Sequence, residues 1–239
     1  MLSKNEIKYI QSLFHKKNRD AENLFIVEGA KAVNELLQST FTLANVYAVA
    51  QWIEETGKNA TVISDDELKK ISNQTAPNRV LAIAEKKTSS TFPGYKNKIT
   101  LALDGIQDPG NMGTIIRIAD WFGIQNIIAS SDTADFYNPK VIQATMGSFT
   151  RVNIWYNDLK QLLKTAAVPV FGAVMNGENI FTKQKIKEGI ILIGNEGKGI
   201  REDIMPLINN KITIPKKGNA ESLNAAVAAG IILGQLVKT

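Results

Sequence analysis

The segment "LDGIQDPGNMGTIIRIADWFG", residues 103–123, decides the fold. It begins at the end of an apolar run that predicts a buried strand over 99–103. It then turns through Asp-Gly and Asp-Pro-Gly and continues with the apolar spacing of a helix over 112–122. A strand that leads through a glycine-rich turn into a helix is typical of an α/β domain. Arg117 lies within the apolar run of that helix, so its presence needs an explanation.

Two interpretations of Arg117 are open at this point. The side chain can form a structural ion pair, with Asp104 or Asp120 as its partner. It can instead bind a phosphate or a reacting hydroxyl in a pocket, because a guanidinium group presents its donors in a fixed fork.

Further strands and helices follow this segment in alternation. The apolar runs predict strands at 99–103, 125–129, 151–155, 168–174, 190–194 and 211–214, and the helical spacing predicts helices at 112–122, 138–147, 157–165, 199–208 and 221–237. Asn138 before Pro139 is a typical helix start. Because the strands are continuously apolar, we expect a parallel sheet that is covered on both faces.

The chain before this series predicts a smaller α/β sandwich. Strands are expected at 24–29, 45–50, 61–64 and 79–85, with a helix over 30–39 and a capping box in which Ser64 precedes Glu67 by three residues. The following stretch is rich in Ser, Thr, Pro, Gly and Lys and lacks an apolar period. We therefore predict a first domain at 1–88, a linker at 89–97 and a second domain at 98–239.

The composition excludes several kinds of chemistry. The 239 residues include no cysteine and one histidine, so disulfides, cysteine-ligated metals and a cysteine nucleophile are excluded. We expect no metal site. The sequence has no run of 18 apolar residues and no signal-peptide core at its start, so we expect a cytoplasmic protein without a membrane segment. The net charge of +5 permits a polyanionic partner without requiring one.

Three glycine-rich turns follow strands in the second domain. They are "DPGNMG" at 108–113, "GNEGKG" at 194–199 and "IPKKGNAESLNAAVAAG" at 214–230. Glycine lets the backbone approach a ligand closely, and ligands of open α/β sheets bind where such loops gather. Neither the dinucleotide fingerprint nor the phosphate-binding P-loop motif is present. The turns therefore predict a pocket lined by backbone groups.

Polar residues in these turns are candidates for the site. Asn111 can cap the helix that follows it, and Glu196 within a glycine turn faces either a ligand or solvent. Capping explains one of Glu221, Ser222 and Asn224 but not readily all three. The final helix carries many small residues, which permit tight packing on the sheet, on a threaded loop or in a dimer.

Together the three motifs resemble the SpoU/TrmH family of RNA 2′-O-ribose methyltransferases in the SPOUT superfamily. The matching segments are "DPGNMGTIIRIADWFG", "LIGNEGKGI" and "IPKKGNAESLNAAVAAGI", in the family's order and spacing. Many relatives have "SLNVSVA" where this chain has "SLNAAVA", so Ala225 and Ala226 depart from that pattern while Ser222 and Asn224 are kept.

The resemblance implies a parallel-sheet catalytic domain with a deep trefoil knot that binds S-adenosylmethionine, and a homodimer. By position it implies cofactor contacts from Gly194, Ile214 and Leu223. It also implies an active site made of Asn111, Arg117, Glu196, Ser222 and Asn224, with Asn111 and Arg117 facing the ribose.

The N-terminal residues resemble the substrate-binding domain that precedes the catalytic domain in ribosomal RNA members, a domain similar to ribosomal proteins that grip kinked RNA. We therefore expect 23S ribosomal RNA as the substrate. A transfer RNA substrate and a non-catalytic RNA-binding or ribosome-assembly protein are the alternatives, and an ordinary nucleotide enzyme is a third. In "HKKNR", Lys16, Lys17 and Arg19 are expected to contact RNA, although a solvated turn explains the same residues.

For a methyl transfer to a hydroxyl, the hydroxyl must lose a proton as it attacks. The only histidine, His15, lies in the other predicted domain. A guanidinium group is a poor base because it stays protonated in proteins. We expect Arg117 to grip the adjacent phosphate and stabilise the developing alkoxide, while water or Glu196 takes the proton.

Overall fold

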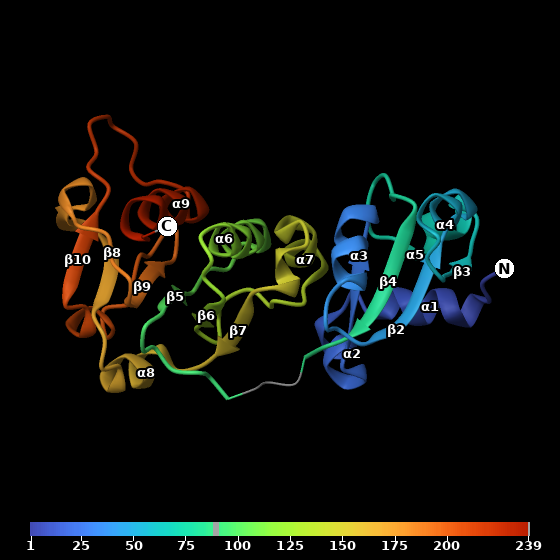
Figure 1. Ribbon diagram of the computed structural model, residues 1–239, viewed down its shortest axis with the longest axis horizontal. Coiled ribbons are helices and arrows are strands. Elements are labelled where there is room, and N and C mark those ends of the chain that lie inside the picture. Colours follow the sequence, from blue (N-terminus) through green and yellow to red (C-terminus); the bar gives the residue numbers. More distant parts are fainter. Residues whose placement is uncertain (88–90, 239) are drawn as a thin grey trace. The chain divides into compact units, whose positions relative to one another are not determined.

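The computed structural model describes residues 1–87 and 91–238, which form two compact units (Figure 1). The first unit contains residues up to 87 together with 137–150. The second unit contains residues 91–136 and 151–238. Each unit is built around its own β-sheet.

The second unit has the parallel sheet that the sequence predicts. Its six strands lie in the order β10-β8-β9-β5-β6-β7, and every neighbouring pair is parallel. The strands are β5 (Ile99–Asp104), β6 (Asn126–Ala129), β7 (Asn153–Tyr156), β8 (Val170–Asn179), β9 (Gly189–Gly194) and β10 (Asn210–Thr213). The helices are α6 (Pro109–Trp121), α8 (Leu159–Thr165) and α9 (Ala225–Leu236), with short 3₁₀ turns η2 (Ile180–Thr182) and η3 (Met205–Leu207).

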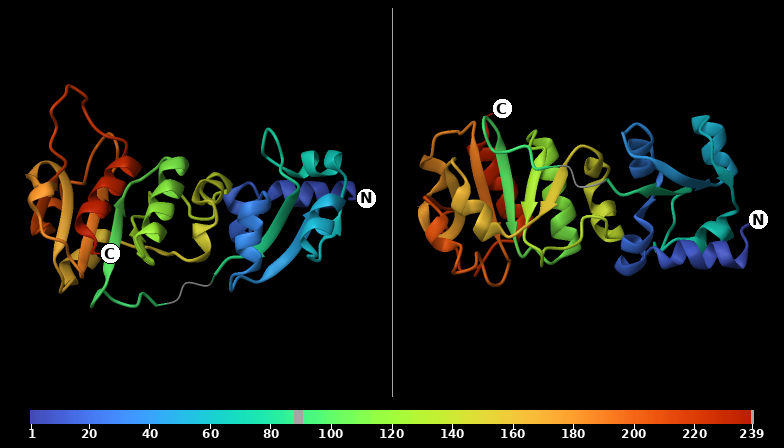
Figure 2. Two further views of the ribbon diagram at one scale, coloured as in Figure 1. Left: turned by 45° about the horizontal axis from the view of Figure 1, so that its top comes forward. Right: turned by 90° about the horizontal axis from the view of Figure 1, so that it is seen from below.

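Helices cover the sheet of the second unit, which explains why its central strands β5, β6 and β9 are apolar on both faces. Helices α6 and α9 pack side by side (Figures 1 and 2). Helix α8 contributes Leu159 and Leu163 to a separate buried cluster with Ala102 of β5 and Leu192 of β9. The result is a layered α/β arrangement in which the sheet is shielded from water and its carboxyl ends stay open to loops.

The helix starts are explained by local capping. Asp108 caps α6, because its Oδ1 accepts the N–H of Asn111 at 2.7 Å and Pro109 occupies the first helical position. Asn111 therefore lies in the first turn and is not the cap that we considered from the sequence. Asn224 caps α9 by accepting the N–H groups of Ala226 and Val227.

The helix predicted over 199–208 is wrong. The chain there forms turns and the short 3₁₀ segment η3. Ile200, Ile204 and Ile208 have the spacing of a helix face, and all three are buried in the cluster beside α8. Their spacing reflects burial of a compact loop, because turns can place every fourth side chain inward without continuous helical hydrogen bonding.

Two close backbone approaches in the second unit require glycine. A Cβ atom on Gly177 would lie 2.4 Å from the carbonyl carbon of Ile212. A Cβ atom on Gly194 would lie 2.4 Å from the carbonyl carbon of Gly199. Such crowding fits a tightly threaded region, and the trefoil knot itself stays a prediction.

The first unit is an α/β sandwich with a four-stranded sheet in the order β1-β4-β2-β3. The β1–β4 and β2–β4 pairs are antiparallel, and the β2–β3 pair is parallel. Its strands are β1 (Leu24–Glu28), β2 (Leu43–Ala48), β3 (Thr61–Val62) and β4 (Val80–Glu85). Its helices are α1 (Lys4–Ser12), α2 (Lys16–Glu22), α3 (Ala30–Leu37), α4 (Ala50–Thr56) and α5 (Asp65–Ile71). The predicted capping box of Ser64 and Glu67 starts α5.

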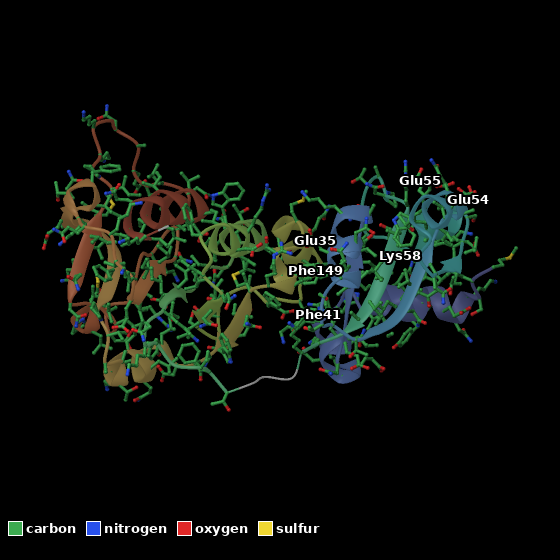
Figure 3. The ribbon with its side chains drawn as sticks, in the orientation of Figure 1. Glu35, Phe41, Glu54, Glu55, Lys58 and Phe149 are labelled. Carbon is green, nitrogen blue, oxygen red and sulfur yellow. The ribbon has the colours of Figure 1, made fainter. Side chains whose placement is uncertain are left out.

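A segment from the middle of the predicted second domain belongs to the first unit instead. It contains α7 (Pro139–Thr145), which starts at the predicted Asn138–Pro139 pair, and the 3₁₀ turn η1 (Ser148–Thr150). The ring centroid of Phe149 lies 5.9 Å from that of Phe41 and 6.0 Å from that of Phe25. Phe149 and Phe41 are labelled in Figure 3. These buried aromatic contacts explain why residues 137–150 belong to the first unit. No local pattern in the sequence indicates these contacts.

The described part of the predicted linker at 89–97 is attached to the second unit. Residues 89–90 lie outside the described residues. Phe92 packs edge-on against Trp155 with ring centroids 5.2 Å apart, and Tyr95 lies beside Phe92 on the buried cluster of the second unit. Two aromatic side chains within a polar stretch are therefore enough to attach it to a core.

Arg19 is buried rather than displayed. Its side chain is 1% exposed, and its Nη1 donates to the carbonyl oxygens of Leu13 and Phe14 at 3.1 and 2.8 Å. The prediction that Arg19 contacts RNA is wrong for this conformation, because its guanidinium ties the end of α1 to α2.

Within the described parts of the chain, no helix has the length and apolar character that crossing a membrane would require.

We expect Arg19→Met to lower the local free energy of unfolding of the first unit by about 2–4 kcal/mol, since it leaves buried carbonyl groups without a charged donor. Hydrogen-exchange mass spectrometry of peptides from β1 and β4 measures this. Lys17→Met, at an exposed position two residues away, is the control and should change stability by at most about 0.5 kcal/mol. Equal hydrogen-exchange protection in the Arg19→Met and Lys17→Met variants would contradict this role of Arg19.

Candidate active site

The candidate site lies where the strand order of the second unit reverses. From β5, the chain adds β6 and β7 on one side and later places β9, β8 and β10 on the other. The loops that leave the carboxyl ends of β5 and β9 meet at this point, which is where open α/β sheets bind ligands.

Asn195 ties these two loops together. Its Nδ2 donates to the carbonyl oxygen of Gly105 at 2.7 Å, which joins the turn after β9 to the turn after β5. Its Oδ1 accepts the N–H groups of Gly197 and Lys198 at 2.9 and 3.0 Å. Backbone hydrogen bonds in both directions between Asn195 and Gly199 close the turn. Glu196 is thus carried on a rigid loop.

Asn111 connects all three glycine-rich motifs. Its Nδ2 donates to Oε1 of Glu196 at 2.6 Å, and its Oδ1 accepts Nδ2 of Asn224 at 2.8 Å. These residues are 85 and 113 positions from Asn111 in the chain. The network brings together three of the five predicted active-site residues. It presents carboxylate and amide groups at one place, where they can orient a hydroxyl and receive its proton.

Among the residues that the structure describes, Arg117 has no side-chain partner that would explain its place in the helix. Asp120 is paired with Arg151, whose Nη2 lies 2.9 Å from Oδ2. Asp104 is paired with Arg201, whose Nε lies 2.7 Å from Oδ1. Arg117 itself is exposed, and within the described residues it makes no ion pair and no side-chain hydrogen bond. Both ion pairs considered from the sequence are therefore excluded, and the guanidinium is available to a ligand.

The other predicted residues lie around the network without joining it. Ser222 is exposed, and no side-chain hydrogen bond holds it among the described residues. Leu223, which is 47% exposed, directly precedes the cap of α9, and Ile214 directly follows β10. Gly194 ends β9. Ile214, Ser222 and Leu223 are thus part of the loop of residues 214–224, which extends from the end of the sheet (Figure 1).

Asn195 and Arg201, two structural residues of the site, were not singled out from the sequence, and Asp104 was considered only as a partner of Arg117. Asn195 lies inside the "GNEGKG" motif, and a polar residue there was a usable signal. Asp104 is a carboxylate at the end of an apolar strand and is 1% exposed. Its Oδ2 accepts the backbone N–H of Arg201 at 2.8 Å, so it holds the loop after β9. Only the fold shows that Arg201 is its partner.

Asp132 lies in the loop after β6, and its surroundings favour the charged form of its carboxyl group. A hydrogen bond from the Ser130 side chain, with smaller contributions from the charges of Arg201 and Lys198, holds the pKa of the Asp132 carboxyl below its ordinary value.

The basic residues of the first unit give a weaker picture than the sequence suggests. Lys16 is exposed but forms an ion pair with Asp20 at 2.5 Å, one helical turn away. Lys17 is exposed on the same helix. With Arg19 buried, the predicted patch is reduced to these two lysines.

Among the described residues, no group of three or more histidine, aspartate or glutamate side chains is arranged to hold a metal ion.

Comparison with known proteins agrees with this geometry. Residues 98–234 match the sequence model of the SpoU rRNA Methylase family, and residues 4–82 match the MRM3-like substrate binding domain. The chain is 29% identical to the 23S rRNA (guanosine(2553)-2′-O)-methyltransferase RlmP of Bacillus subtilis, over 98% of this chain and 97% of that protein. It is also 29% identical to the 23S rRNA (guanosine-2′-O-)-methyltransferase RlmB of Coxiella burnetii, over 94% and 86%.

A solved structure shares the whole architecture. An AdoMet-bound rRNA methyltransferase from Sinorhizobium meliloti superposes with a TM-score of 0.85 and 30% identity, over 98% of this chain and 95% of that one.

Asn224 has two separable roles, as cap of α9 and as donor to Asn111. We expect Asn224→Ala to lose both and to lower the free energy of unfolding by about 1 kcal/mol. Asn224→Asp keeps an acceptor for the cap and should retain most of that stability, while it removes the donor to Asn111. Urea unfolding measures the first effect, and the NMR signals of the Asn111 side-chain amide measure the second. Unchanged amide signals in Asn224→Asp would contradict the network.

Proposed function

Because this chain belongs to the SpoU rRNA methylase family, we propose that it transfers a methyl group from S-adenosylmethionine to the 2′-hydroxyl of a ribose in 23S ribosomal RNA. The observation that carries the proposal is the network of Glu196, Asn111 and Asn224, since it draws one polar side chain from each of the three motifs to one place. An unpaired Arg117 on the same helix as Asn111 supplies a cation for the substrate.

The loop between β10 and α9 fits a bound nucleoside cofactor. None of its backbone N–H groups from 216 to 223 donates to another backbone group within the described residues, so they are available to a ligand. Leu223 offers an exposed apolar side chain beside them. We propose that Gly194, Ile214 and Leu223 hold S-adenosylmethionine. When bound, this cofactor supplies an electrophilic methyl group on a sulfonium.

The protein's own groups then account for the remaining steps. Arg117 grips the phosphate next to the target ribose and stabilises the developing negative charge on the attacking oxygen. Asn111 orients Glu196, and the rigid turn around Asn195 keeps the carboxylate in place. The proton leaves to Glu196 or to water. Precise positioning can supply much of the rate of such a displacement. Ser222 completes the site from the loop.

Several observations support ribosomal RNA over transfer RNA as the substrate. Two of the relatives that match nearly the whole chain, RlmP and RlmB, are named for 23S rRNA. The first unit matches a substrate-binding domain as well. We propose that this unit holds the RNA, with Lys16 and Lys17 as contacts to phosphate, and that the protein works in the cytoplasm. A transfer RNA substrate is an outcome of the assay below.

We also propose a homodimer that is formed through α6 and α9. Trp121 is 85% exposed at the end of α6, and Val227 is 52% exposed on α9, the helix packed beside it. Arg117 lies one turn before Trp121 and therefore on the same side of α6. Such a large exposed aromatic side chain is typical of an interface, and a partner there would place the active site near the dimer contact.

The reaction is tested with radiolabelled S-adenosylmethionine and unmodified ribosomal and transfer RNA transcripts, which are digested to nucleosides afterwards. We expect label in a 2′-O-methylnucleoside from 23S rRNA. Arg117→Ala should lower kcat about 10²–10³-fold, the usual effect of removing a group that stabilises developing charge. Arg117→Lys should retain more activity than Arg117→Ala but less than the wild type, because lysine lacks the forked donors of the guanidinium group.

Near-normal turnover of Arg117→Lys would contradict the fork-specific role. Glu196→Gln distinguishes the proton acceptors in the same assay. A loss of about 10²–10⁴-fold assigns the proton to Glu196, and a small loss assigns it to water. Label in transfer RNA alone would contradict the ribosomal substrate, and cofactor binding without label would favour a ribosomal particle.

For the dimer, we expect Trp121→Glu to shift the protein from dimer to monomer in sedimentation velocity, since a buried charge at an interface core is costly. Val62→Glu adds the same charge at another exposed apolar position, in the first unit, and should leave the association unchanged. A wild-type protein that sediments as a monomer at micromolar concentration would contradict the proposal.

A further inference from the structure

A polar cleft of about 440 Å³ lies beside the proposed active site, at the carboxyl ends of β6 and β7. Its walls come from the ends of these strands, from the start of α8 and from the loop after β9. Its lining includes Ser130, Tyr156, Asn157, Lys160, Arg201 and Asp203. The volume is in the range that accommodates a small ligand. None of Gly194, Ile214 and Leu223 lines it, so it is separate from the proposed cofactor site.

The cleft is held in shape by buried contacts. The carboxylate of Asp104, which is 1% exposed, fixes both the backbone and the side chain of Arg201. Ser130 accepts the backbone N–H of Gly105 at 2.8 Å. Tyr156 accepts the N–H of Phe136 at 2.7 Å and donates to the carbonyl oxygen of Ala134 at 2.6 Å. Its ring is therefore fixed while staying 38% exposed.

One residue is shared between the cleft and the active site. The N–H of Gly105 bonds to Ser130 in the cleft wall, and its carbonyl oxygen accepts Nδ2 of Asn195. Asn195 directly precedes Glu196. The turn after β5 therefore connects the wall of the cleft to the loop that carries Glu196.

Both cationic side chains of the cleft are paired with carboxylates, and Asp158 adds a further carboxylate to the lining, which argues against a phosphate as its occupant. Arg201 is paired with Asp104, and Nζ of Lys160 lies 3.1 Å from Oδ2 of Asp203. The hydrogen bond from Lys160 is also the main cause that lowers the pKa of the Asp203 carboxyl below its ordinary value. The cleft therefore presents both hydrogen-bond donors and acceptors. A neutral ring with donors and acceptors on its edge, such as a nucleobase, matches this lining.

Tyr156 and Arg201 add flat surfaces to these polar groups. The side chain of Arg201 is 48% exposed in spite of its ion pair. Proteins commonly bind single-stranded RNA by stacking its bases on aromatic rings or guanidinium planes and by forming hydrogen bonds with the edges of the bases.

We propose that this cleft binds an unstacked RNA base next to the nucleotide whose ribose is methylated. The inference rests on the proposed function, and it assigns substrate recognition to the second unit itself in addition to the first. Lys160 and Asp203 read the edge of the base, and Tyr156 and Arg201 support its face.

The test is the double variant Lys160→Ala/Asp203→Ala, which leaves the net charge and the Asp104–Arg201 pair unchanged. Lys164→Ala/Glu202→Ala is the matched control, because it removes the same two charges from exposed positions on the same helix and loop, outside the cleft lining. We expect the first variant to raise KM for RNA about tenfold, a common contribution of one base contact, with KM for S-adenosylmethionine unchanged. The control should behave as the wild type.

A second arm uses RNA with an abasic nucleotide on either side of the methylated position. At one of these two positions, the missing base should weaken RNA binding to the wild type and to the control variant. It should cause little further loss of binding in Lys160→Ala/Asp203→Ala, because the missing base and the double substitution remove the same contact. Equal abasic penalties in all three proteins would overturn the proposal. A raised KM for S-adenosylmethionine would overturn it too, since the cleft would then hold the adenine of the cofactor.

Direct binding of the same RNAs by fluorescence anisotropy separates this inference from the proposed function. If the wild type transfers no methyl group to any RNA, the proposed function fails, while the binding measurements still decide about the cleft. If the wild type is active and the cleft variant binds and reacts as the control does, only the cleft inference fails.

Discussion

The side-chain amide of Asn111 is the interaction on which the organisation of the site depends. It donates to Glu196 and accepts from Asn224 simultaneously, and these partners come from loops that follow different strands. An amide is suited to this position because it has a donor and an acceptor at one branch point. A carboxylate could not donate to Glu196, and an ammonium group could not accept from Asn224. The identity of one residue therefore couples three motifs.

The amide can act in this way only because the backbone around it is held by other polar groups. Asp108 caps α6 and so sets the direction in which Asn111 leaves the first turn. Asn195 closes the turn that carries Glu196, and Asp104 fixes the loop that follows this turn. Each contact satisfies backbone groups that would otherwise be left unpaired at the end of a buried sheet. The same contacts that complete the fold therefore prepare the site for chemistry.

Much of the fold could be predicted from periodicity. All six strands of the second unit occur where the apolar runs place them. The signal is clearest for the central strands β5, β6 and β9, which are buried along nearly their whole length and are therefore apolar on both faces. The prediction of a helix at 199–208 was wrong, although it used the same signal, the spacing of apolar residues, that located the strands. Burial repeats every fourth residue there, and burial does not distinguish a helix from a compact loop. Asn111, Glu196 and Asn224 could be named from their motifs and the family resemblance, whereas their hydrogen bonds could not.

The assignment of individual charges depended on tertiary structure. Arg19 and Arg117 are both arginines in helices, yet Arg19 is buried against backbone carbonyls, whereas Arg117 is exposed and makes no ion pair within the described part of the chain. Asp104 and Asp120 were equally plausible partners for Arg117, until Arg151 and Arg201 were found to occupy them. Likewise, the aromatic contacts of Phe149 move a segment of the chain into the other unit.

The sequence by itself determined the class of fold, the three loops of the site and the residue types available for catalysis, because these follow from local spacing and from motifs that are short and contiguous. Only the tertiary structure decided which polar groups meet, which arginine stays unpaired and where the cleft beside the site forms. The physical reason is that a charge or an amide acquires its role from the partner that burial brings within hydrogen-bond distance. Those partners here lie up to 113 residues apart in the chain.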